Sequence, residues 1–337
     1  MNIKHYKRHL KIAGIALFVV FCLLFLWSVY TPKSVSESPS VYYNIETGTG
    51  SKDIAKDLKD RGVIKSSLFF KFYVLISGQH ANLQAGIYDF SGSMSIAKIV
   101  NKLVRGDIAK NKITIMSGWT LEDMGKYFEG RKIYSKKDFL QATKKDYSKD
   151  FAFLDQKPKN TSLEGYIFPD TYYVPLIFSP EQFVKMALGN LDKKLTPEFK
   201  KKIEKDKKSI HQIIIMASII EKEVPSLEDK KIVSGILWKR MLNDMPLQVD
   251  STVNYVTGKN DIRVAIKDTK IDSLYNTYKY KGLPLGPISN PGMDSILAAI
   301  YPTKSEYWFY LSAKGTGKTI YSATFKEHTV ATRKYLN

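Results

Sequence analysis

The segment SIHQIIIMASIIEKEV (residues 209–224) carries the clearest structural and chemical signal in the chain. Apolar residues repeat along it at helical spacing, namely Ile213, Ala217, Ile220 and Val224. Glu221 comes one helical turn after Ala217, so its carboxylate should project from the edge of this apolar face, whereas Glu223 points nearly opposite. The segment therefore predicts a helix buried in the core of a folded domain, with one carboxyl group at the edge of its buried face.

An isoleucine-rich surround would disfavour the charged form of Glu221, and a general acid needs that property near neutral pH. Two plainer interpretations compete with a catalytic one. Glu221 could simply begin the polar end of the helix, or it could pair with a lysine. Spacing alone does not separate the three.

Three other segments combine aromatic rings with amide and carboxylate groups around prolines and glycines. They are LEGYIFPDTYYV (163–174), PLQVDSTVNYV (246–256) and YNTYKYKGLPLGPISNPG (275–292). Aromatic faces beside hydroxyl partners on stiff loops suit a groove that binds sugar rings. Ordinary turn chemistry is the alternative interpretation.

The N-terminus predicts a membrane span. Residues 12–30 hold no charge, and a helix of this length reaches about 28 Å, close to the thickness of one hydrocarbon core. Four bases precede the segment and only Lys33 follows it closely, so the positive-inside rule places the N-terminus in the cytoplasm. A cleaved signal peptide is the alternative, but the apolar run exceeds the usual length and no A-x-A site follows it.

Charge indicates the class of partner. The chain of 337 residues has 52 Lys and Arg against 33 Asp and Glu, a net charge of +19. Five of these bases and no acids lie in residues 1–33, which leaves +14 on the exported part. An exported domain meets no genome, so we expect no nucleic-acid partner. Anionic lipid headgroups and carboxylates of the cell wall remain, with plain solubility as the simplest explanation.

Strand and helix patterns alternate along the exported part, which predicts an α+β fold. Strand, glycine turn and amphipathic helix recur near 42–62 and 112–130, and Thr120 with Asp123 should cap the second of these helices. Small units of this kind are frequent in wall-binding modules of the LysM type. We expect a cytoplasmic tail at 1–11, the membrane helix at 12–30, a linker at 31–41, a LysM-like region at 42–130, a connecting helical segment at 131–160 and the main domain at 161–337.

The sequence contains no motif for several other kinds of binding site and catalysis. GTGKT (315–319) lacks the first glycine of a phosphate-binding loop, and its alternating flanks predict a β-hairpin instead. The five histidines show no ligand spacing, so we expect neither a metal nor another cofactor. The single cysteine, Cys22, lies in the predicted span, which excludes a disulfide scaffold and a cysteine nucleophile.

The order LEGYIFPDTYYV, ASIIEKEV, LQVDSTV and YNTYKYKGLPLGPISNPG, behind one N-terminal span, resembles the endolytic murein transglycosylases of the MltG (YceG-like) family. The resemblance runs from about residue 40 to the end. It implies that Glu221, the first Glu of the E-K-E triplet, is catalytic, and that a LysM-like subdomain precedes the catalytic domain. One departure is visible, because Lys239 stands where the family pattern F-x-N-R-L has Asn.

The resemblance also implies a reaction. Lytic transglycosylases cut the β-1,4 bond between N-acetylmuramic acid and N-acetylglucosamine without water, because the muramyl C6 hydroxyl attacks its own C1. One Glu can donate the proton and then take one back, so the second carboxylate of a hydrolase is unnecessary. We expect a groove lined by Glu164, Tyr166, Gln248, Asp250, Asn276 and Tyr278, with Glu164 and Asp250 orienting the sugar or stabilising oxocarbenium charge.

The implied protein is a single-pass enzyme of the cell inner membrane that cuts nascent peptidoglycan strands, limits their length and works beside peptidoglycan synthases. The competing hypothesis is a non-catalytic, membrane-anchored scaffold that binds peptidoglycan and positions synthesis partners. The apolar setting expected for Glu221 favours the enzyme.

Overall fold

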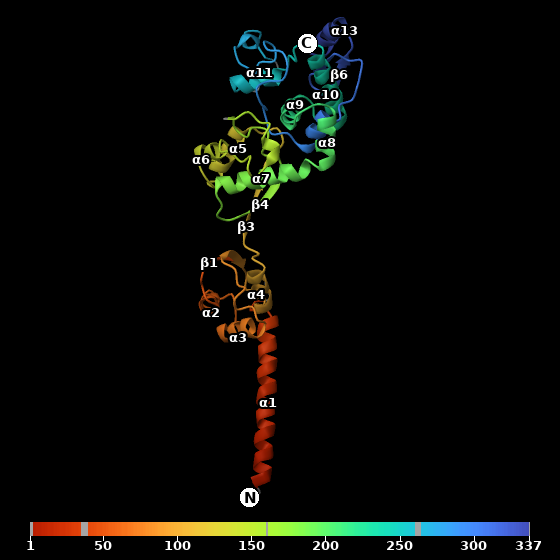
Figure 1. Cartoon of the computed structure of the whole chain (residues 1–337). Helices are drawn as coiled ribbons and strands as arrows, with labels where there is room; N and C mark the ends of the chain where they lie inside the picture. The colour runs from red at the N-terminus through yellow and green to blue at the C-terminus, as the bar shows by residue number, and fades with distance from the viewer. Residues whose placement is uncertain (1–2, 35–39, 160, 260–263, 337) are drawn as a thin grey trace. The chain divides into compact units, whose positions relative to one another are not determined.

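The computed structural model describes residues 3–34, 40–159, 161–259 and 264–336, and it divides the chain into two compact units (Figure 1). Unit 1 comprises residues 1–112 and 173–177, and unit 2 comprises 113–172 and 178–337. The secondary structure is mixed, with three separate two-stranded sheets among many helices, which confirms the predicted α+β class. The expected region 42–130 thus extends past the division after residue 112, and part of the expected linker, 35–39, lies outside the described residues.

Unit 1 is built on an antiparallel strand pair with helices packed against it. β1 and β2 pair from Val41↔Phe90 to Ile45↔Gly86. The apolar faces of α2 and α4 supply much of the core, which also contains Phe70 and Val74 of α3. The elements are α1 (Ile3–Tyr30), β1 (Val41–Ile45), α2 (Ser51–Asp60), α3 (Ser67–Ile76), β2 (Gly86–Phe90) and α4 (Ile96–Val104).

The helix α1 is long and apolar enough to cross a membrane over Lys7–Tyr30, and it alone passes this test among the described residues. It contains the whole predicted span 12–30. Its last turns are not isolated from the rest of unit 1, because α1 packs against both α3 and α4 (Figure 1). Val29 is fully buried, whereas most of the preceding residues of the helix are exposed.

Two strands are shared between the units at their division. β3 (Lys110–Thr114) and β4 (Thr171–Pro175) form the second two-stranded sheet. The chain passes from unit 1 to unit 2 within β3, and β4 carries it back for residues 173–177.

Unit 2 holds the segment 209–224, which forms α9. A capping box between Ser209 and Gln212 begins this helix, and Pro225 follows its end. Burial is wider than the predicted stripe, since every residue from Ile213 to Ile220 is buried. A helix that is apolar on all sides lies in a core, and α9 is accordingly covered by α8, α10, α11 and α12.

The remaining elements of unit 2 surround this core. They are α5 (Leu121–Gly130), α6 (Lys136–Ala142), a 3₁₀ turn (Ala152–Leu154), α7 (Pro180–Lys194), α8 (Pro197–Lys205), α9 (Ile210–Glu223), α10 (Leu227–Leu242), α11 (Asp250–Thr257), a second 3₁₀ turn (Asp268–Lys270), α12 (Met293–Ile300), β5 (Phe309–Ser312), β6 (Thr319–Ser322) and α13 (Phe325–Tyr335). The predicted capping box of Thr120 and Asp123 begins α5. The predicted hairpin is confirmed as β5 and β6, which pair from Phe309↔Ser322 to Ser312↔Thr319.

Candidate active site

Glu221 lies in the last turn of α9, where this helix meets the N-terminus of α12. Its Oε2 accepts hydrogen bonds from the Gly292 backbone N–H at 2.9 Å and from the Ser295 hydroxyl at 2.6 Å. Its Oε1 lies 3.3 Å from Nζ of Lys230 on α10. The side chains of Glu221 and Lys230 are only 11% and 6% exposed, so this ion pair is largely shielded from water.

This environment differs from the one predicted. The apolar face of α9 is present, but the carboxyl group at its edge is met by three hydrogen-bond donors, two of them neutral and one cationic. Gly292 and Ser295 donate to Oε2, and the contact of Lys230 with Oε1 is an ion pair. The interpretation that Glu221 pairs with a lysine is therefore confirmed. The two oxygens differ in their contacts, because Oε2 accepts from two neutral donors and Oε1 faces Lys230.

The backbone at Gly292 approaches Glu221 and Ser117 closely. A Cβ added at Gly292 would lie 2.7 Å from Oγ of Ser117 and 3.5 Å from Oε2 of Glu221. Glycine at this position therefore lets the backbone N–H reach the carboxylate without a Cβ that crowds Ser117. Because Gly292 is the N-cap of α12, the positive end of that helix also faces Glu221.

Asn290 holds the loop that carries Gly292. It is fully buried, and its side chain donates to the Trp119 carbonyl at 3.0 Å and to Glu164 Oε1 at 2.7 Å. Its Oδ1 accepts from the Ile167 N–H at 2.9 Å. Asn290 thus joins three segments that are far apart in the sequence.

A second link ties the same loop to α9. Ser218 accepts a hydrogen bond at Oγ from the Ile288 N–H, and its carbonyl accepts one from the Ser289 hydroxyl, both at 3.0 Å. Ser218 lies one turn before Glu221. The loop and the catalytic candidate are therefore positioned by the same helix.

The predicted groove residue Glu164 is buried and hydrogen-bonded within the protein. It is 6% exposed, and its carboxyl group accepts from the Leu121 N–H and from Asn290. Burial raises the pKa of Glu164 from 4.5 to about 8, against the lowering effect of these hydrogen bonds. At neutral pH the group is largely protonated.

Tyr166 is likewise part of the framework. It is fully buried, its hydroxyl lies 2.7 Å from Nδ1 of His211, and its ring is nearly parallel to that imidazole, with ring centroids 6.3 Å apart. Burial lowers the pKa of His211. This pair joins the segment 163–174 to the first turn of α9.

The structure brings Asp250 and Tyr278 together. The Tyr278 hydroxyl donates to Asp250 Oδ1, and both side chains are partly exposed. Gln248 lies two residues before Asp250 and donates its backbone N–H to the Thr277 carbonyl at 3.1 Å; it is exposed and has a left-handed backbone with φ of 50°. Asn276, by contrast, is 1% exposed and donates to the carbonyls of Thr269 and Ile271.

Glu223 is a further, partly buried carboxyl group that the sequence pattern did not single out. Burial is the main cause that raises its pKa, and the nearby charge of Asp250 adds to the effect. Glu223 accepts a hydrogen bond from the Tyr310 hydroxyl at 3.0 Å. The pKa of Tyr278 is raised mainly by burial and by Asp250, and the charge of Glu223 adds to this. The pair of Asp250 and Tyr278 therefore lies near the same end of α9 as Glu221.

Lys239 contacts a loop of unit 2. Its Nζ donates to the Ser305 carbonyl at 3.0 Å and lies 4.3 Å from the centre of the Trp308 ring. Desolvation by burial lowers the pKa of Lys239. These contacts hold the loop at 305–308, which comes directly before β5.

Among the other residues missed by the sequence pattern, Lys230, Gly292 and Ser295 touch Glu221 directly. The local sequence did not indicate that these residues would contact Glu221, because Lys230 is one of many lysines and the other two lie some 70 residues downstream. The glycine and proline content of 275–292 did mark that loop as special.

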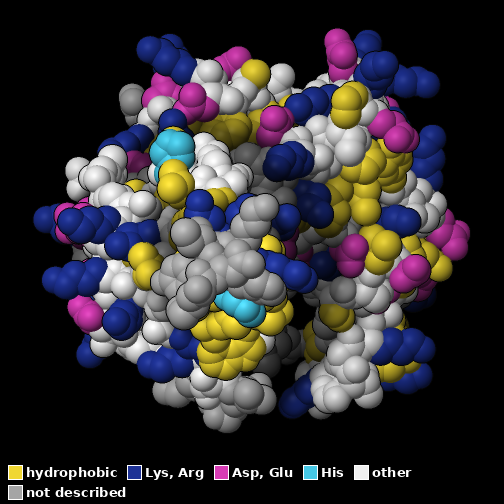
Figure 2. Space-filling model, turned by 90° about the horizontal axis from the view of Figure 1, so that it is seen from below, with side chains coloured by type: hydrophobic (Ala, Val, Ile, Leu, Met, Phe, Trp, Pro, Cys, Tyr) yellow, Lys and Arg dark blue, Asp and Glu magenta, His cyan; other side chains and the backbone are white. Residues whose placement is uncertain are grey.

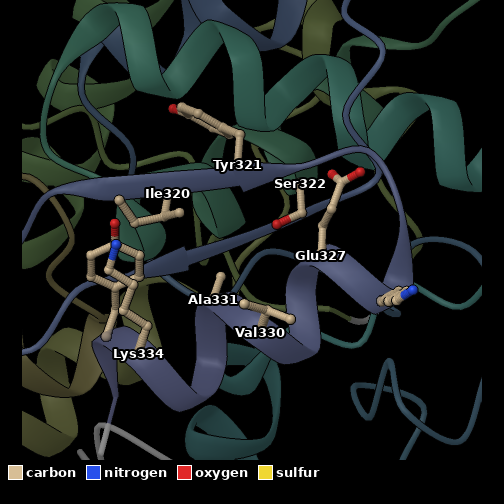
Figure 3. A pocket seen from close by; sticks show the side chains of 9 residues that line it. Ile320, Tyr321, Ser322, Glu327, Val330, Ala331 and Lys334 are labelled. Atoms are coloured by element: carbon tan, nitrogen blue, oxygen red, sulfur yellow. The ribbon is translucent and has the colours of Figure 1, made fainter.

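Two surface features lie apart from these residues. A pocket between β6 and α13 is lined by side chains that include Tyr321, Glu327 and Lys334 and contains none of the predicted site residues (Figure 3). Lysine and arginine side chains are scattered over the face shown in Figure 2, with acidic side chains among them. Among the described residues, no three His, Cys, Asp or Glu side chains gather as metal ligands would.

Comparison with known proteins identifies the family. Residues 43–334 match the profile of the YceG-like family. The endolytic murein transglycosylase of Bacillus subtilis is 35% identical over 92% of this chain and 89% of that protein. The Streptococcus pneumoniae protein of the same name (strain D39) is 27% identical, and the match covers 91% of this chain but only 60% of that protein.

A solved structure agrees with these relatives. The crystal structure of a yceG-like protein from Listeria monocytogenes superposes with a TM-score of 0.59 at 34% identity, covering 88% of this chain and 99% of that one. The chain described here belongs to the YceG-like family.

Proposed function

We propose that this chain is an endolytic murein transglycosylase with Glu221 as its general acid and base. The observation that carries the proposal is the convergence of Gly292, Ser295 and Lys230 on this one carboxyl group. Relatives of that name, matched over nearly the whole chain, support it.

The two oxygens of Glu221 have different roles in this proposal. Oε2 is held by Gly292 and Ser295, which fixes the plane of the carboxyl group. Oε1 faces Lys230 and is the oxygen that would meet the substrate. In the bound complex Oε1 would pass its proton to the glycosidic oxygen as a general acid.

The reaction needs no other carboxylate. Glu221 gives its proton to the bridging oxygen as the bond from C1 of N-acetylmuramic acid breaks. The C6 hydroxyl oxygen then bonds to C1, and its proton returns to Glu221, leaving a 1,6-anhydro end. Lys230 stabilises the carboxylate that exists between these two proton transfers.

The other predicted residues divide into two groups. Gln248 is exposed and Asp250 and Tyr278 are partly exposed, and these three are our candidates for contact with the sugar chain. Glu164, Tyr166 and Asn276 are buried and hold the loops that shape the site. Asp250 is the better placed of the two acidic helpers, because Glu164 is buried and protonated at neutral pH.

We extend the proposal to the rest of the chain. α1 anchors the protein in the cytoplasmic (inner) membrane with its N-terminus inside, and the compact strand and helix elements of unit 1 form a LysM-like module that binds peptidoglycan. Cleavage close to the membrane would limit the length of nascent strands beside their synthases.

Digestion of purified peptidoglycan by the Glu221→Gln variant tests the central claim. We expect anhydromuramyl ends from the parent and none from the variant, while the exposed neighbour Glu228 on α10, changed to Gln, leaves activity unchanged. Tryptophan fluorescence would verify that the variants are folded. Reducing ends from the parent would make it a hydrolase, and a variant that still binds glycan and complements a deletion would favour the scaffold.

A further inference from the structure

The helix α3 has an apolar stripe that faces away from the core of unit 1. Phe70 and Val74 are buried in that core. On the other side, Leu68, Leu75 and Ile76 are more than half exposed and Phe72 is 38% exposed. Their spacing places them on one helical face, defined here as the α3 stripe, comprising Leu68, Phe72, Leu75 and Ile76.

The ring contacts of α3 fix its level along α1. Phe69 and Phe72 each contact both Phe21 and Phe25, with ring centroids 5.2 to 6.1 Å apart. The two helices lie side by side at this point (Figure 1). The helix α3 therefore packs beside the second half of the predicted span, not beyond its end.

The length of the span decides what surrounds these contacts. If residues 21–30 of α1 stood in water together with α3, only residues 12–20 would remain uncharged and inside the bilayer. Nine residues of helix reach about 14 Å, whereas a hydrocarbon core is about 30 Å thick. A spanning α1 therefore needs residues 21–30 in the membrane, and α3 must be there with them.

We propose that the α3 stripe inserts into the acyl chains of the membrane leaflet that α1 leaves at its C-terminal end, so that α1 and α3 together form the anchor. This inference rests on the proposed membrane span. The occupant of the stripe is lipid because the stripe is continuous with the exposed apolar surface of α1. The membrane interior requires satisfied backbone groups, and in α3 these pair along the helix, with a cap from Ser66 at its start and bonds from residues 77–79 to carbonyls of its last turns.

The polar groups nearby agree with this depth. Lys71, the one charged residue of α3, lies at the border between the α3 stripe and the buried face, where its long side chain can reach the headgroups. Trp27 and Tyr30 are exposed near the end of α1, as expected of interfacial aromatic residues. Lys65 lies 3.6 Å from the centre of the Trp27 ring and donates to Thr31, which marks the headgroup level.

Quenching by lipid tests the inference in the full-length protein. Cys22→Ala removes the native thiol, and a single cysteine carrying an environment-sensitive fluorophore replaces Leu75, Phe18 or Tyr42, which are 64%, 67% and 61% exposed. Each labelled protein is reconstituted into phosphatidylglycerol and phosphatidylethanolamine vesicles, with and without a lipid spin-labelled on its acyl chain. Phe18 on α1 reports the span itself, and Tyr42 on β1 is the matched control in unit 1.

We expect strong quenching at Phe18 and Leu75 and several-fold less at Tyr42. Quenching at Phe18 without quenching at Leu75 would overturn the inference and leave the span intact. No quenching at Phe18 would instead refute the span. A label at position 68, in place of Leu68, repeats the test if the change at Leu75 disturbs folding. Efficient disulfide crosslinking of the unlabelled Leu75→Cys variant, together with no lipid quenching of the labelled one, would show that a second copy covers the α3 stripe and would refute the inference.

Discussion

Changing Glu164 to Gln should remove a large pH dependence from the stability of unit 2. Burial raises the pKa of this carboxyl group from 4.5 to about 8. The unfolded chain therefore loses the proton near pH 4.5, whereas the folded chain keeps it until about pH 8. Between these values the folded state binds more protons, so its free energy of unfolding falls as pH rises.

The magnitude follows from the width of this window. Each pH unit between the two pKa values of Glu164 costs about 1.4 kcal/mol, so the parent loses about 5 kcal/mol between pH 4.5 and pH 8 from this one group. Above pH 8 the loss is complete. Glutamine keeps the Oε1 that accepts from both Leu121 and Asn290 and cannot ionise, so the variant should escape the loss.

Urea unfolding of the detergent-solubilised chain at a series of pH values provides the assay. Tryptophan fluorescence reports unit 2 through Trp119, Trp238 and Trp308. The backbone carbonyl of Trp119 accepts a hydrogen bond from Asn290, which also contacts the mutated side chain. Parent and variant should unfold at similar urea concentrations at pH 5, with the variant clearly more resistant at pH 8.5. If the unfolding midpoints of the parent and the variant changed with pH by the same amount across this range, the claim that folding keeps Glu164 protonated would be refuted.

Two further changes test the candidate active site. Lys230→Met should lower the rate of anhydromuramyl product formation about tenfold to a hundredfold, because the cation that stabilises the Glu221 carboxylate is lost. Lys230→Arg keeps the positive charge and should retain most of the parent's rate. Equal rates for the parent and both variants would contradict this role of Lys230. Gly292→Ala should destabilise unit 2 by about 1–3 kcal/mol in urea unfolding and slow the same reaction, because its Cβ would meet Ser117 Oγ at 2.7 Å. Adding Ser117→Ala should restore much of both, and a double variant as defective as the single one would show that the strain lies elsewhere.

Local patterns in the sequence predicted the secondary structure around the site well. The capping box at Thr120, the hairpin around residues 315–319 and the helix through Glu221 are all present. Each depends on residues within a few positions of one another, where hydrogen bonds and side-chain spacing are set by the local chain. The extent of burial around α9 was underestimated, because one stripe cannot show how many neighbouring helices cover a segment.

The groove residues show where such patterns stop. Glu164, Asp250 and Asn276 looked alike as polar side chains on stiff loops. In the structure the Asn276 side chain donates to carbonyls of its own loop, and the buried Glu164 accepts from the Leu121 N–H. Asp250 accepts from the Tyr278 hydroxyl and is partly exposed. Burial separates these roles, and burial depends on packing between distant segments.

The sequence by itself determined the family, the apolar span and the candidate Glu221, because each is written in a contiguous run of residues. Only the tertiary structure decided the chemical state of the site. It placed Gly292 and Ser295, 71 and 74 residues away, on one carboxylate oxygen and Lys230 beside the other. It likewise placed α3 beside the span. Electrostatic and hydrophobic environments are sums over neighbours in space, and periodicity along the chain does not specify those neighbours.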